Sequence, residues 1–115
     1  MNSISIGERL WFEETLLGAT LNYRSSENPG SVLFRVGISY QSLRDCNAAL
    51  GKDACLWTIR DGSLSIYGDP EELTLTFCSV EGEFLETGVS LHGRELALFR
   101  YAVDTLSSKQ KALLN

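Results

Sequence analysis

The chain has 115 residues, of which 43% are hydrophobic and 22% are charged, and its formal net charge is −5 at pH 7. These values are typical of one soluble domain that buries about two-thirds of its unfolded surface, and they exclude a disordered chain. The longest stretch without a charged residue, 15–23, has nine residues, whereas a membrane helix needs about 20 apolar residues.

The N-terminus and the cysteines both indicate a cytoplasmic protein. No basic segment precedes an apolar run at the N-terminus, so we expect no signal peptide. Cys46, Cys55 and Cys78 are odd in number and lack the spacing of a metal site. We therefore expect reduced thiols, with no metal and no cofactor.

Residues 3–23 alternate between apolar and polar side chains, which is typical of strands with one buried face. A tight turn at 13–14 would place Phe12 opposite Thr15 and fold the segment into a hairpin. A slip of one residue would expose the whole apolar set, so the pattern favours a hairpin over a helix. The predicted apolar face contains Ile4, Ile6, Leu10, Phe12, Leu17, Ala19, Leu21 and Tyr23.

A third strand is predicted at 32–40, where the apolar residues again alternate. Pairing Tyr23 with Val32 puts these residues on the apolar face of the first hairpin. Residues 41–53 break the alternation and predict a short helix near 41–50.

Asp61-Gly62 is the strongest local signal, because Asp-Gly suits the two-residue turn of a hairpin. The turn lies between two expected strands, 55–60 and 63–67. A further strand at 73–77 and another beginning at Leu85 extend this second group.

A three-residue loop at 80–82 is predicted between these last two strands, with Gly82 at its left-handed position. This loop would place Phe77 opposite Leu85. The register then puts Leu73, Leu75 and Phe77 on one apolar face.

Residues 93–114 predict one long helix. Its apolar residues recur at steps of three and four and form a single stripe: Leu96, Phe99, Val103 and Leu106. Gly93 permits the start of the helix, and Glu95 complements the positive charge of its first turn.

Together these elements predict an α+β fold in a single domain, 1–115. It contains a curved, mostly antiparallel sheet of about seven strands in meander hairpins, packed by one C-terminal helix. One helix cannot cover seven strands. The sheet must therefore curl or split into two packed sheets, use 41–53 as a second cover, or bind another chain.

No residue pattern indicates catalysis. The single histidine, His92, could act as a general base, but we interpret it as a residue at the strand-to-helix junction. Gly51-Lys52 has the ending of a phosphate-binding loop, but Asp53 stands where Ser or Thr is needed. We expect a non-enzymatic protein. The alternative is a ligand-binding or enzymatic domain with a pocket between sheet and helix near His92.

Acidic residues are concentrated in one stretch. From Asp61 to Leu91 the sequence has seven acidic residues and no Lys or Arg, while the remaining residues carry +2 (10 basic and 8 acidic). An acidic surface attracts a basic partner and disfavours direct contact with nucleic acid. The alternative interpretation is a solvated surface that prevents pairing between sheet edges.

The predicted function is the occlusion of a basic protein partner that itself handles nucleic acid. An immunity protein for a nuclease toxin, or a phage-encoded inhibitor of a host complex (phage counter-defence), would act in this way. A self-associating accessory or structural domain, working as a homodimer, is a further alternative. The predicted partner-binding residues are Asp61, Asp69, Glu71, Glu72, Glu81, Glu83, Glu86, Trp11, Phe84 and Tyr101.

Overall fold

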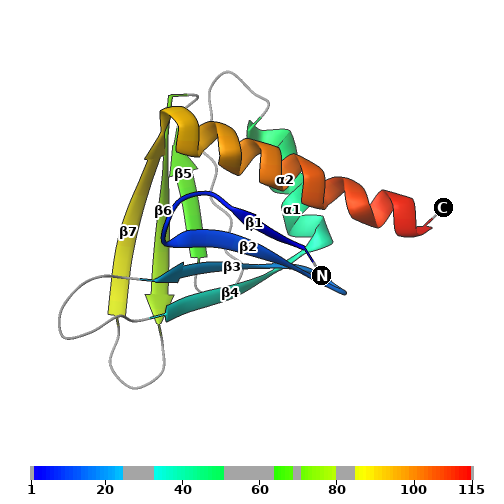
Figure 1. Ribbon diagram of the computed structural model, residues 1–115, viewed down its shortest axis with the longest axis horizontal. Coiled ribbons are helices and arrows are strands. Elements are labelled where there is room, and N and C mark those ends of the chain that lie inside the picture. The colour runs from blue at the N-terminus through cyan, green and yellow to red at the C-terminus, as the bar shows by residue number, and fades with distance from the viewer. Residues whose placement is uncertain (1, 25–32, 51–63, 69–70, 80–84, 115) are drawn as a thin grey trace.

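The computed structural model describes residues 2–24, 33–50, 64–68, 71–79 and 85–114 of the chain (Figure 1). In chain order its elements are β1 (Ser3–Ser5), β2 (Leu10–Thr15), β3 (Gly18–Arg24), β4 (Leu33–Ser39), α1 (Tyr40–Leu50), β5 (Leu64–Gly68), β6 (Glu72–Ser79), β7 (Leu85–His92) and α2 (Gly93–Leu114).

Within these residues, seven antiparallel strands form two sheets. The first sheet has the order β1-β2-β3-β4, and the second sheet has the order β5-β6-β7. Each sheet is a meander followed by a helix, and Figure 1 shows the strands of the two sheets running crosswise. The predicted α+β architecture is confirmed, in its form with two packed sheets.

The first predicted turn is wrong. β2 continues through residues 13–14 to Thr15, and the connection to β3 is Leu16-Leu17. Leu17, predicted on the apolar face, is 82% exposed. The turn ends at Gly18, which has a φ of 155° and lies so close to β4 that a Cβ atom would overlap the carbonyl oxygen of Ile38. A glycine is required at this position, and it fixes where β3 begins.

The predicted apolar face nevertheless survives. The prediction places Leu17 opposite Leu10, whereas the structure places Tyr23 there, six residues further along the chain. A register shift by an even number of residues keeps every side chain on the same side of the sheet. Buried residues of this face are Ile6, Leu10, Phe12, Ala19 and Leu21, and Ile4 and Tyr23 are partly buried.

β4 shows the same kind of shift. Phe34 faces Tyr23, where Val32 was predicted, and the side chains of Phe34, Val36 and Ile38 are buried as expected.

Tyr40, predicted at the end of the third strand, instead begins α1. The helix starts there because Ser39 caps it: the Ser39 hydroxyl accepts a hydrogen bond from the backbone N–H of Ser42 at 3.1 Å. The short helix predicted near 41–50 is confirmed, and it buries Leu43, Cys46 and Leu50.

The register of the second sheet also differs from the prediction by an even number of residues. Phe77 faces Thr87 and not Leu85, because the β6–β7 ladder ends at Ser79 opposite Leu85 and leaves 80–84 as the connection. The buried side chains of this sheet are Leu64, Ile66, Leu73, Leu75, Phe77 and Leu91. The predicted strand 55–60 and the Asp61-Gly62 turn lie outside the described residues.

Aromatic side chains join the two sheets and α2 into one core. Phe77 of the second sheet contacts Tyr23 and Phe34 of the first, with ring centroids 5.6 Å and 6.0 Å apart. Phe99 of α2 packs against Phe12 at 5.5 Å. The core therefore lies between the inner faces of both sheets and the helices.

α2 spans the residues that the sequence predicted, and its stripe Leu96, Phe99, Val103 and Leu106 is buried. It runs past α1, where the side chain of Asn47 donates a hydrogen bond to Asp104 at 3.1 Å. Near its C-terminal end, Lys109 forms an ion pair of 2.7 Å with Glu14 of β2. Both helices are thus fastened to each other and to the first sheet.

Candidate functional site: a cleft between the two sheets

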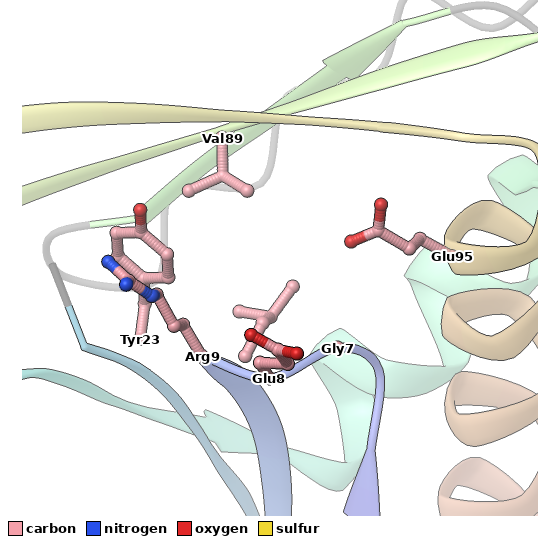
Figure 2. Close-up of a pocket in the computed structure, with 7 residues that line it drawn as sticks. Gly7, Glu8, Arg9, Tyr23, Val89 and Glu95 are labelled. Carbon is pink, nitrogen blue, oxygen red and sulfur yellow. The ribbon is translucent and has the colours of Figure 1, made fainter. Parts of the chain in front are cut away.

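A cleft of about 460 Å³ opens where the first sheet, the second sheet and the start of α2 meet (Figure 2). Its lining residues come from the β1–β2 connection, from the start of β2, from β3, from β7 and from α2. They are Gly7, Glu8, Arg9, Leu10, Tyr23, Val89 and Glu95. Three distant parts of the sequence therefore contribute to one concave site.

The β1–β2 connection is a tight turn that presents charged side chains to this cleft. The backbone N–H groups of Ile6 and Gly7 both donate hydrogen bonds to the carbonyl oxygen of Leu10, at 2.9 and 3.2 Å. The carbonyl oxygen of Arg9 accepts a hydrogen bond of 2.9 Å from the backbone N–H of Arg24. These bonds fix the backbone from which the side chains of Glu8 and Arg9 extend, and both side chains are exposed.

The wall between the charged groups is apolar and rigidly packed. Leu10 is 3% exposed, and Tyr23 and Val89 are partly buried against the core. The ring of Tyr23 stacks on Phe77, with 15° between the ring planes, so the aromatic wall of the cleft is held by the core itself.

Glu95 enters the cleft from the first turn of α2. The helix starts at Gly93, whose φ of 58° lies in the left-handed region that glycine adopts at low cost, directly after the last residue of β7. Figure 2 shows the Glu95 carboxylate pointing from α2 into the cleft. Opposite it lies Gly7, where an added Cβ atom would come within 3.0 Å of a Glu95 carboxylate oxygen.

One alternative from the sequence, a ligand-binding or enzymatic domain with a pocket between sheet and helix near His92, stays a prediction. His92 stands between Val89 and Glu95 in the chain but does not line the cleft. Its side chain is exposed, and its cross-strand neighbour in β6 is Glu72.

The outer face of the second sheet is a separate candidate surface. Cross-strand rows place Tyr67 beside Thr74 and Ser90, and Glu72 beside His92. Tyr67 is 45% exposed, and Glu72, Ser90 and His92 are exposed. The described part of this face is polar, with one large aromatic side chain, Tyr67, and no Lys or Arg in the sheet.

The structure places the predicted partner-binding residues on four different elements or leaves them undescribed. Glu71 and Glu72 are exposed at the start of β6, and Glu86 lies in β7. Trp11 is on the outer face of the first sheet, where its indole N–H donates to Glu13 at 2.9 Å, and Tyr101 is 61% exposed on α2. Asp61, Asp69, Glu81, Glu83 and Phe84 lie outside the described residues.

The outer face of the first sheet contains a polar network that sequence patterns do not indicate. Asn22 is 0% exposed although it points away from the core, and its side-chain oxygen accepts a hydrogen bond of 2.7 Å from Arg35. Its amide nitrogen donates to the Thr20 hydroxyl at 3.2 Å and to the backbone carbonyl of Trp11 at 3.4 Å. These bonds satisfy a buried polar group and hold Arg35 in place.

The described residues give no sign of a metal site or a membrane span. No group of three or more His, Cys, Asp or Glu side chains within them could hold a metal ion. Among the helices in this part of the chain, none is long and apolar enough to cross a membrane.

Comparison with known proteins assigns no family. No protein-family model matches the chain, and no curated protein and no solved structure matches it either.

Proposed function

We propose that the protein is a non-enzymatic binding protein that docks on a basic protein partner through the outer face of the second sheet and occludes it. The observation that carries this proposal is the one-sided charge of the second sheet. Residues 64–91, which span this sheet and its connections, contain acidic residues but no Lys or Arg, whereas the strands of the first sheet combine Arg24 and Arg35 with Glu13 and Glu14.

The geometry of this face supports docking by a protein surface. Its described side chains are short, apart from Tyr67, Glu72 and His92, so a flat partner can approach the strands closely. Tyr is enriched among the residues that dominate binding energy at interfaces, and Tyr67 lies on the edge strand β5, beside Thr74 of the middle strand. Exposed Glu71 and Glu72 at one end would steer a basic partner toward it.

A partner that handles nucleic acid fits this chemistry, because such proteins carry a basic surface that contacts phosphates. Covering that surface would block its activity without any reaction. An immunity protein for a nuclease toxin and a phage-encoded inhibitor of a host complex are the two classes that work in this way. Asp61, Asp69, Glu81 and Glu83, in the same acidic stretch, remain sequence predictions for this surface.

Affinity capture with three immobilised baits tests the proposal: wild type, Glu71→Lys/Glu72→Lys, and Glu8→Lys/Asp45→Lys. The two double variants change net charge equally, and both Glu8, in the β1–β2 turn, and Asp45, in α1, are exposed residues outside the strands of the second sheet. We expect a basic protein that binds wild type and the Glu8/Asp45 variant at low salt and is lost with the Glu71/Glu72 variant. Equal capture by all three baits would contradict the proposal.

Size-exclusion chromatography with light scattering addresses the alternative of self-association. A stable wild-type homodimer that the Glu71→Lys/Glu72→Lys change converts to monomer would assign the face to a second copy of the chain. A wild-type monomer leaves the face available to a different protein, as proposed.

A further inference from the structure

We propose that the cleft between the β1–β2 turn, β7 and the start of α2 binds a short zwitterionic peptide with an apolar side chain. In this complex Arg9 holds the peptide carboxylate and Glu95 holds its ammonium group. The site is distinct from the outer face of the second sheet and does not depend on it.

Groups of opposite charge line different sides of the cleft. Figure 2 shows the Arg9 guanidinium beside the ring of Tyr23 and the Glu95 carboxylate on the side of α2, with the Glu8 carboxylate between the two in this view. A guanidinium can bind a carboxylate through two parallel hydrogen bonds, and a carboxylate accepts charge-assisted hydrogen bonds from an ammonium group. Glu8, which lines the same cleft, offers a second acceptor for the ammonium group.

The separation of the two charged groups favours a peptide over a free amino acid. A free α-amino acid carries its ammonium and carboxylate groups on one carbon atom and cannot contact opposite walls. Each added residue lengthens an extended chain by about 3.3–3.6 Å. A dipeptide or tripeptide therefore separates its terminal charges, as the cleft separates Arg9 from Glu95.

The surface between the charges suits an apolar side chain. Leu10 is almost fully buried beneath the cleft, and Tyr23 and Val89 provide partly buried apolar surface beside it. The volume of about 460 Å³ is within the range of about 300–1,000 Å³ that is typical of small-molecule sites. A leucine-sized side chain would contact all three residues.

The lining is held in place before any ligand binds. The turn bonds of Ile6 and Gly7 to Leu10 fix one wall, and stacking on Phe77 fixes Tyr23. Glycine at position 7 leaves room for the Glu95 carboxylate, since a Cβ atom there would stand 3.0 Å from it. Such packing reduces the entropy that the turn and the aromatic wall lose when the ligand binds.

Titration of the ¹⁵N-labelled protein with L-alanyl-L-leucine tests the proposal. We expect saturable shifts of the backbone signals of Gly7, Leu10 and Val89, with weaker binding of the N-acetylated dipeptide, the dipeptide amide and free L-leucine. Shifts confined to other residues would overturn the proposal. Tighter binding of 1,4-diaminobutane than of the dipeptide would also overturn the proposal, because the two ammonium groups of that ligand would contact only Glu8 and Glu95.

Selective loss of affinity in two variants tests which residue holds each end of the ligand. Arg9→Gln should lower the affinity for the free dipeptide about three- to tenfold, as expected when an exposed charge pair is lost. The same change should leave the affinity for the dipeptide amide unchanged. Glu95→Gln should do the same for the free dipeptide while leaving the N-acetylated form unchanged. Equal weakening of all three ligands by both variants would contradict these roles.

Matched controls separate these effects from changes in net charge or folding. Arg44→Gln and Asp45→Asn remove the same charges from the exposed side of α1 and should leave dipeptide binding unchanged. Arg9→Lys keeps the charge and should retain more affinity than Arg9→Gln. If the α1 variants weaken binding as much as the cleft variants, the cleft is not the site.

Discussion

The ring of Tyr23 in β3 stacks on the ring of Phe77 in β6, with centroids 5.6 Å apart and 15° between the planes. This contact does two things. It joins the inner faces of the two sheets, and it orients the aromatic wall of the cleft. Packing between the sheets and the shape of the candidate ligand site therefore depend on the same pair of residues.

Phe77→Ala should lower the free energy of unfolding by about 3–5 kcal/mol, because Phe77 is fully buried and contacts both Tyr23 and Phe34. Urea unfolding followed by Trp fluorescence measures this loss. Tyr23→Phe keeps the stacked ring and should cost much less. A loss below about 1 kcal/mol for Phe77→Ala would mean that the sheets are not joined through this ring.

Phe99→Ala should lower the free energy of unfolding by about 3–5 kcal/mol, since the ring is 0% exposed and packs on Phe12. Tyr101→Ala, at a side chain that is 61% exposed, should change it by about 0.5 kcal/mol or less. Thermal unfolding of both variants compares the two sides of α2. Equal losses would show that the wrong side of the helix is assigned to the core.

Gly18→Ala should destabilise the first sheet by about 3 kcal/mol or more, because its φ of 155° is unfavourable for alanine and the new methyl group would overlap the Ile38 carbonyl oxygen. Gly37→Ala is the matched control, since no atom lies within 4 Å of a Cβ placed there. Chemical denaturation that ranks the two variants equally would contradict the close approach of β3 and β4 at Gly18.

Asn22→Ala should lower the free energy of unfolding by about 1–3 kcal/mol, because it removes the acceptor for Arg35 and the bonds to Thr20. Arg35→Gln, at an exposed side chain, should cost less. Denaturant unfolding of the two variants measures both losses. The comparison tests whether the hydrogen bonds of Asn22 or the Arg35 side chain itself contributes more to the free energy of unfolding. A larger loss for Arg35→Gln than for Asn22→Ala would reverse this assignment.

Sequence patterns predict which face of a sheet a side chain lies on better than they predict which residues pair across strands. Alternation assigns Leu10, Phe12 and Leu21 to the core, and they are buried. It cannot distinguish registers that differ by an even number of residues, because all of them bury the same side chains. The observed register of β2 and β3 depends on the backbone of Gly18, which a pattern of apolar residues does not reveal.

The cleft shows a similar limit. Gly7, Glu8 and Arg9 interrupt the alternation between β1 and β2, and this interruption is the one sequence signal for the turn that lines the cleft. Glu95 could be assigned to the first turn of α2, but its approach to Gly7 depends on how the helix lies across the first sheet. Arg9 and Glu95 lie at opposite ends of the sequence, so their placement around one cleft is a property of the folded chain.

The most direct test of the proposed docking surface is the association rate with the captured basic partner across a range of ionic strength. Glu71→Lys/Glu72→Lys is compared with Glu8→Lys/Asp45→Lys, and thermal unfolding first establishes that both variants are folded. The two variants have the same net charge, so a difference between them reports the location of the charge and not its sum.

We expect the Glu71/Glu72 variant to associate more slowly than wild type and to lose most of the salt dependence, because exposed charges at an interface act mainly on the rate of encounter. The Glu8/Asp45 variant should keep a rate and a salt dependence close to those of wild type. Equal rates for both variants at every salt concentration would contradict docking through the outer face of the second sheet.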